Sequence, residues 1–214
     1  MNMHHIIITG ASRGIGHATA LLYASMGWNI SICSRHCDYQ MTQTQDAITA
    51  AGGQYFSFCG DMGNAADAEE FLTKAVQTFG TPEILVNNAG ISHIGLLQDM
   101  TPMQWDDIIR TNLSSVFYTS RVIIPYFLQE KHGRIINVSS VWGSVGASTE
   151  VAYSTTKGGI NAFTKALAKE LAPSGIPVNA VACGMIDTSM NSFLDPEELA
   201  AVIDEIPAGR AGTP

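Results

Sequence analysis

The chain has 214 residues, of which 46% are hydrophobic and 14% are charged, and its formal net charge is −8. This length suits one α/β domain with a full core, and the large apolar fraction excludes a disordered chain. The acidic charge argues against nucleic acid or an anionic membrane as the main partner. The chain shows no signal peptide and no apolar run approaching about 18 residues, so we expect a cytoplasmic protein without a membrane span.

The cysteines and histidines do not predict a metal site. The four cysteines, Cys33, Cys37, Cys59 and Cys183, have no metal-ligand spacing, and the six histidines include no H-E-x-x-H pair. Cys33 and Cys59 sit in apolar runs typical of strands. We therefore expect buried, reduced thiols rather than disulfides.

The N-terminal region has the order strand, glycine turn, helix. His5–Thr9 is a short β-branched run typical of a buried parallel strand, and it leads into the turn G-A-S-R-G-I-G at 10–16. An Ala- and Leu-rich helix follows and stops at Gly27. In this context the glycines let the backbone approach a pyrophosphate, and the helix N-terminus supplies N–H groups for it. The pattern predicts a dinucleotide site; the alternative is a glycine turn without a ligand.

The end of the second expected strand, 28–33, indicates which dinucleotide. An NAD-specific site usually has an acidic residue there for the ribose hydroxyls, whereas this chain has Ser34 and Arg35. Arg13 lies inside the glycine turn. Two guanidinium groups suit the additional phosphate of NADP. Asp38 is interpreted as the N-cap of the next helix, not as a ribose ligand.

Further strands are expected at 54–59, 83–86, 134–139 and 177–182. Helices are expected from Asn64 to Phe79, from the capping box at Thr101 to Lys131, and after Asp195. Asp61 follows the third strand, at the sheet edge where an adenine amino group could meet a carboxylate.

Tyr153 and Lys157 stand four residues apart at the start of a segment with helical periodicity through Leu171, which places both on one face. A phenol loses its proton near pH 10, and a nearby ammonium lowers that pKa. Tyr153 is therefore a candidate general acid or base. Ser140, at the end of an apolar strand, is a candidate donor to a substrate oxygen. The alternative is a chance Y-x-x-x-K pair on an ordinary helix. Asn112 lies within the helical region expected after Thr101, and taken alone it would be interpreted as a surface residue.

Five motifs together resemble the classical short-chain dehydrogenase/reductases. They are T-G-x-x-x-G-x-G at 9–16, N-N-A-G at 87–90, Asn112, Ser140 and Y-x-x-x-K at 153–157. The resemblance covers residues 5–214. It implies a Rossmann-like, doubly wound parallel sheet in three α/β/α layers, and hydride transfer from a nicotinamide to a carbonyl. It assigns Tyr153 as the acid, Lys157 as ribose ligand and modulator of the Tyr153 pKa, Ser140 as carbonyl donor and Asn112 as part of a water relay.

The motifs and the resemblance together give two sets of binding residues. For NADP(H) they are Gly10, Ser12, Arg13, Gly14, Ile15, Gly16, Ser34, Arg35, Asp61, Met62, Asn88, Ala89, Gly90, Tyr153, Lys157, Gly184, Ile186 and Thr188. For the substrate they are Ser92, His93, Ser140, Trp142, Val145, Glu150 and Tyr153, with the stretch 185–206.

The chain departs from the family pattern in two places. Cys183-Gly184 stands where the family usually has Pro-Gly. Members usually also continue beyond the G-R-x-G-T-P at 209–214, with a further helix and a seventh strand that contribute to oligomer interfaces. We therefore expect a single Rossmann-like domain over 1–214 that is short at its C-terminus, and a homo-oligomer unless that shortness disrupts it.

The leading interpretation is an NADPH-dependent oxidoreductase that reduces a ketone to a secondary alcohol, and two alternatives remain open. The overall pattern is similar to 3-oxoacyl-[acyl-carrier-protein] reductases, which predicts a small-molecule or carrier-bound ketone substrate. The stretches 139–151 and 182–184 resemble reductases of the 5-aminopentanone modification on elongation factor P, which implies a protein substrate. The alternative of another class is a non-catalytic nucleotide-binding protein.

Overall fold

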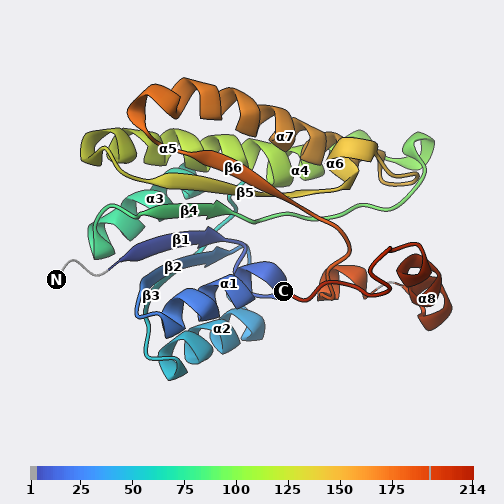
Figure 1. Cartoon of the computed structure of the whole chain (residues 1–214), viewed down its shortest axis with the longest axis horizontal. Helices are drawn as coiled ribbons and strands as arrows, with labels where there is room; N and C mark the ends of the chain where they lie inside the picture. Colours follow the sequence, from blue (N-terminus) through green and yellow to red (C-terminus); the bar gives the residue numbers. More distant parts are fainter. Residues whose placement is uncertain (1–3, 193) are drawn as a thin grey trace.

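The central element of the computed structural model, which describes residues 4–192 and 194–214, is a six-stranded parallel sheet (Figure 1). The strand order is β3-β2-β1-β4-β5-β6, with every neighbouring pair parallel. The strands are β1 His5–Thr9, β2 Asn29–Ser34, β3 Gln54–Cys59, β4 Ile84–Asn87, β5 Arg134–Ser140 and β6 Val178–Cys183. The chain crosses from β3 back to the other side of β1, so the order reverses between β1 and β4. This confirms the predicted Rossmann-like, doubly wound fold.

Helices cover both faces of the sheet and separate two apolar cores. Helices α1 (Gly14–Ser25) and α2 (Tyr39–Ala50) lie on one face, with a core that includes Ile30 and Ile48. Helices α3 (Ala65–Phe79), α5 (Ser115–Glu130) and α7 (Val151–Leu171) lie on the other, around Phe71 and Phe127. Among the described residues no helix is long and apolar enough to cross a membrane.

The helix starts follow the capping chemistry that the sequence predicts. The Asp38 side chain accepts a hydrogen bond from Met41 N at 3.2 Å, and Asn64 accepts from Ala66 N at 2.9 Å. Capping boxes at Thr101 and Asp195 open α4 (Pro102–Ile109) and α8 (Pro196–Asp204). The remaining short helices are α6 (Trp142–Val145) and 3₁₀ turns at Leu97–Asp99, Ala172–Ser174 and Ser189–Asn191.

The long helical region expected from Thr101 to Lys131 contains a π turn. Helix α4 passes into a π-helical segment at Arg110–Ser114 before α5 begins. Such bulges insert a residue into the helix and redirect the side chains around it, and they are frequent at functional sites. Here the insertion includes Asn112, which is fully buried.

Four strands extend one residue further than the sequence predicts. Strands β2, β4, β5 and β6 end at Ser34, Asn87, Ser140 and Cys183 because the ladder continues to the pairs Ser34↔Cys59, Asn87↔Asn137 and Ser140↔Cys183. Backbone pairing, which sets the end of a strand, does not require an apolar side chain.

The prediction of two buried thiols is confirmed for Cys33 and wrong for Cys59. Cys33 is buried in the interior strand β2, but Cys59 is exposed because β3 is the edge of the sheet. At the opposite edge, on β6, the Val181 side chain is 54% exposed. The four cysteines are free.

Candidate active site

The glycine turn after β1 packs directly against the segment that follows β4. Gly10 has φ +64, and a Cβ atom there would lie 2.7 Å from Ala89 Cα. A Cβ atom on Gly16 would lie 2.5 Å from the carbonyl oxygen of Gly10. Both positions therefore require glycine, because the turn packs against Ala89 and against its own backbone.

Hydrogen bonds hold the glycine turn in place. Asn88 Nδ2 donates to the carbonyl oxygens of Thr9 and Gly10 at 3.0 and 2.8 Å. Thr9 Oγ1 accepts from the backbone N–H groups of Asn88 and Ala89, both at 3.0 Å. The N-N-A-G motif thus fixes the turn to the end of β4, and the Thr9 hydroxyl joins the two segments through contacts that no local sequence pattern predicts.

Asn112 connects the segment after β4 to the start of α7. Its Oδ1 accepts from Ile91 N at 2.8 Å, and its Nδ2 donates to Ile91 O at 2.8 Å and to Thr156 Oγ1 at 3.1 Å. The alternative of a surface asparagine is therefore wrong. Its place in a water relay stays a prediction.

A cavity at the carboxyl ends of β4, β5 and β6, hereafter the active-site pocket, brings together Ser140, Tyr153 and Lys157. Its lining also includes the candidate residues Ile15, Asn88, Gly90, Ser92, Trp142, Glu150, Gly184, Ile186 and Thr188. Apolar side chains from Met185, Met190, Leu194 and Val202 complete it. His93 and Val145 are outside this lining, and Val145 is 70% exposed.

The segment that follows β6 is fixed at both of its ends over this pocket. Gly212 N donates to Met185 O at 2.9 Å, and Asp187 N donates to Gly212 O at 2.8 Å. A Cβ atom on Gly14 would lie 3.2 Å from Thr188 Cγ2, so this segment also touches the glycine turn. Apolar side chains of this segment, from Met185 to Val202, thus contribute to the lining of the pocket.

Burial shifts the pKa values of Tyr153 and Lys157 in opposite directions. Lys157 is 4% exposed, and burial lowers its pKa to about 8. Burial also raises the pKa of Tyr153 to about 12, although a hydrogen bond with Ser140 lowers it in part. This differs from the expectation that Lys157 brings the pKa of the phenol down. The phenol is protonated at neutral pH, which is the form a general acid requires.

Two further side chains in the active-site pocket affect these groups. Ser92 Oγ donates to Glu150 Oε2 at 2.9 Å, and the Glu150 charge contributes to the raised pKa of Tyr153. Cys183 pairs with Ser140 across β5 and β6, and burial raises its pKa while Lys157 lowers it. Cys183, in place of the proline typical of the family, therefore adds a neutral thiol to the pocket.

A second cavity, hereafter the charged pocket, shares the lining residue Gly90 with the active-site pocket. Its lining includes the predicted cofactor residues Gly10, Ser12, Arg13, Ser34, Arg35, Asp61, Met62, Ala89 and Gly90. Both arginines singled out in the sequence thus lie in one pocket with Asp61.

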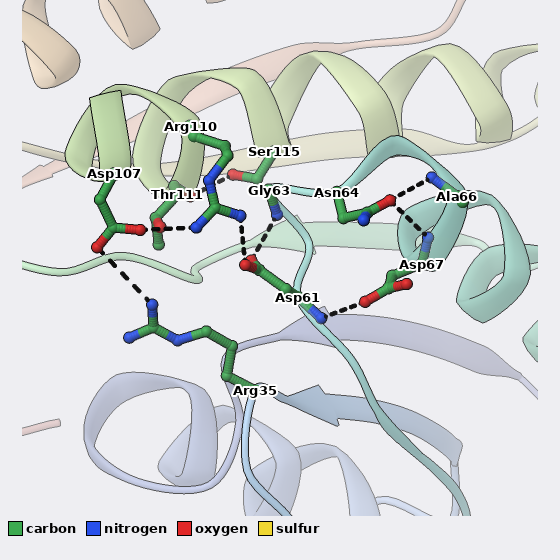
Figure 2. A network of polar contacts seen from close by, with 10 residues as sticks. All are labelled: Arg35, Asp61, Gly63, Asn64, Ala66, Asp67, Asp107, Arg110, Thr111 and Ser115. Atoms are coloured by element: carbon green, nitrogen blue, oxygen red, sulfur yellow. Dashed lines mark hydrogen bonds and ion pairs between the residues drawn. The ribbon is translucent and has the colours of Figure 1, made fainter. Parts of the chain in front are cut away.

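An ion-pair network that the sequence did not reveal lies beside the charged pocket and shares Arg35 and Asp61 with its lining (Figure 2). Arg110 pairs through one guanidinium nitrogen with Asp61 and through the other with Asp107 Oδ1, at 2.7 Å. Burial tends to raise the pKa of Asp61, but hydrogen bonds from Arg110 and Gly63 outweigh it and hold that pKa below its usual value. The three-residue spacing of Asp107 and Arg110 on a helix could have indicated their pair, but no local pattern connects Arg110 to Asp61.

Comparisons with known proteins agree with this geometry. The family model described as short chain dehydrogenase matches residues 4–199. The 3-oxoacyl-[acyl-carrier-protein] reductases FabG of Staphylococcus aureus N315 and Escherichia coli K12 are each 38% identical to this chain over 206 residues. The aligned region covers 96% of this chain, 84% of the Staphylococcus aureus protein and 83% of the Escherichia coli protein. A solved structure described as a short-chain alcohol dehydrogenase from Sinorhizobium meliloti 1021 superposes with a TM-score of 0.93 at 30% identity, covering 100% of this chain and 85% of that one.

Proposed function

This chain belongs to the short chain dehydrogenase family, whose members are oxidoreductases acting on CH–OH or keto groups, and from that premise we propose that it reduces a ketone to a secondary alcohol with NADPH. We propose 3-oxoacyl compounds as the substrate class, because the FabG relatives are named for that reaction. The observation that supports this most directly is that Ser140, Tyr153 and Lys157 line one largely apolar pocket.

The residues around the two pockets fit a nicotinamide dinucleotide. The turn at 10–16 leads into the N-terminus of α1 at Gly14, and the backbone N–H groups of a helix N-terminus suit a pyrophosphate. Arg13 and Arg35 line the charged pocket and suit a 2′-phosphate, while Gly184, Ile186 and Thr188 line the active-site pocket and would meet the carboxamide.

In the proposed reaction NADPH supplies the hydride, and the protein stabilises the negative charge that develops on the carbonyl oxygen. Ser140 Oγ donates a hydrogen bond to that oxygen and orients the ketone. Tyr153 donates its phenolic proton to the same oxygen as negative charge develops there. The Lys157 ammonium stabilises the phenolate that remains. Asn112 holds the segment at Ile91 and the start of α7, and thereby positions Tyr153.

The decisive experiment is NADPH consumption with a small 3-oxo ester, followed by absorbance at the nicotinamide band. Turnover that requires Tyr153 supports the enzyme, whereas no turnover with a panel of ketones would favour the non-catalytic nucleotide-binding alternative. Fluorescence titration tests the cofactor separately. We expect NADPH to bind at least about tenfold more tightly than NADH, since a charge-assisted pair can supply the required free energy. Equal affinities would contradict the proposed preference.

A second candidate substrate is an amino ketone, such as the 5-aminopentanone modification on elongation factor P. The observation that favours it is the Glu150 carboxylate in the active-site pocket, held by Ser92 at 2.9 Å. A carboxylate near the carbonyl site can pair with a substrate ammonium, which a neutral 3-oxoacyl chain does not provide.

A further inference from the structure

Arg35, one of the two arginines proposed for the 2′-phosphate, already has an acidic neighbour. It follows β2 directly, and its side chain extends toward α4, where one guanidinium nitrogen lies 4.0 Å from Asp107 Oδ2 (Figure 2). Arg35 lines the charged pocket, so any phosphate that binds there meets a guanidinium that is paired with a carboxylate.

Asp107 has a closer partner than Arg35. Its other carboxylate oxygen accepts from Arg110 at 2.7 Å, and Arg110 is held in turn by Asp61. Arg35, Asp107, Arg110 and Asp61, hereafter the charge chain, contain two positive and two negative groups and are neutral together. Because Asp107 keeps Arg110 when Arg35 turns away, releasing Arg35 leaves no unpaired carboxylate.

The charge chain lies where solvent weakens each contact. The Arg35, Asp107 and Arg110 side chains are 38%, 41% and 42% exposed. An ion pair of that exposure contributes little, so a phosphate that offers several oxygens at closer range can displace Asp107 from Arg35. The phosphate dianion also experiences the remaining negative charge of Asp107, which opposes its binding.

We propose that Asp107 is a cofactor-selectivity residue, which competes with the cofactor's 2′-phosphate for Arg35 and so limits the preference for NADPH over NADH. This rests on the proposed NADPH dependence. The opposite role, in which Asp107 orients Arg35 for the phosphate, would call for a close, two-point contact; the single contact at 4.0 Å does not provide one.

The test uses two fragments that differ in the 2′-phosphate and need no turnover: adenosine 2′,5′-bisphosphate and adenosine 5′-monophosphate. Isothermal titration calorimetry gives their dissociation constants for the wild type and for Asp107→Asn, which removes the charge and keeps the shape. We expect Asp107→Asn to bind the 2′,5′-bisphosphate about two- to fivefold more tightly and the 5′-monophosphate unchanged. The gain should shrink as salt screens the charges.

A matched control is Asp106→Asn, which removes the same charge from the adjacent position of α4. Asp106 is exposed and makes no ion pair with the described residues. Urea unfolding of each variant checks that it is folded. An equal gain in Asp106→Asn would mean a general effect of net charge and would overturn the proposal.

The variant Arg35→Gln completes a double-mutant cycle. If Asp107 acts through Arg35, Asp107→Asn should not change the dissociation constant of the 2′,5′-bisphosphate in the Arg35→Gln background. Tighter binding by Asp107→Asn in that background would refute the proposal. Unchanged or weaker binding by Asp107→Asn alone also refutes it. The proposed NADPH preference is tested separately, by whether the wild type binds the 2′,5′-bisphosphate more tightly than the 5′-monophosphate. The role of Asp107 is judged instead from the ratio of the variant and wild-type dissociation constants for the 2′,5′-bisphosphate.

Discussion

The ammonium of Lys157 lies over the ring of Tyr153, with Nζ 5.4 Å from the ring centroid. Its hydrogen bond goes to the carbonyl oxygen of Val138 on β5, at 2.8 Å, and not to the phenol. The lysine is therefore a buried cation that the strand holds at the ring, and burial dominates the pKa of both residues. Burial raises the pKa of Tyr153 to about 12, so the phenol keeps the proton that a general acid must donate.

The first prediction is that Tyr153→Phe lowers kcat by at least about 100-fold, because the variant lacks the proton donor. Its dissociation constant for NADPH, measured by fluorescence titration, should stay close to that of the wild type. Tyr126→Phe, on α5 and outside the lining of both pockets, is the control and should keep full activity. Substantial residual turnover in Tyr153→Phe would exclude Tyr153 as the acid.

The second prediction concerns the pH dependence of stability. The pKa of Lys157 is lowered from 10.5 to about 8 in the folded protein, so between these values the unfolded state binds more protons. The unfavourable contribution of Lys157 is complete below about pH 8 and disappears as the pH rises toward 10.5. The urea midpoint of the wild type should therefore rise across this window relative to that of Lys157→Met. A difference that stays constant with pH would contradict the lowered pKa.

The third prediction concerns Thr111, whose Oγ1 is buried without a hydrogen-bond partner among the described residues. Valine has the same shape and no hydroxyl, so Thr111→Val should raise the free energy of unfolding by about 1 kcal/mol. Thr111→Ser keeps the hydroxyl but loses the methyl group, and it should lower the free energy of unfolding. Destabilisation by valine would mean that the hydroxyl has a partner in solution.

The fourth prediction tests the role of Glu150 in substrate choice. Glu150→Gln should lower kcat/KM for an amino ketone about tenfold, because a charge-assisted contact to the ammonium is lost. A neutral ketone of the same length should be affected little. Equal losses for both substrates would show that Glu150 acts on the fold of the loop and not on the substrate charge.

The fifth prediction concerns carrier-bound substrates. The net charge of −8 opposes the approach of an acidic carrier protein. A small 3-oxo ester should therefore have a higher kcat/KM than the same acyl group on acyl-carrier protein, and added salt should increase the rate with the carrier by screening the repulsion. Efficient reduction of the carrier-bound substrate that salt inhibits would contradict this expectation.

The sequence alone determined the elements and their order. Capping at Asp38, Asn64 and Thr101 depends on residues two or three positions apart, and the apolar run at His5–Thr9 shows a buried strand by itself. The glycine turn and the Tyr153–Lys157 spacing are equally local. Such features depend on backbone geometry and on the periodicity of nearby side chains, which can be predicted without the fold.

Only the tertiary structure decided burial and charge pairing between distant residues. Cys59 is exposed because β3 is an edge strand, and the Arg110–Asp61 pair joins residues 49 positions apart. The direction of the Tyr153 pKa shift also depended on the packing around the pocket, since burial raises that pKa and the Lys157 ammonium donates to Val138 O and not to the phenol. Desolvation and ion pairing depend on the three-dimensional surroundings of a group, and a sequence pattern does not contain them.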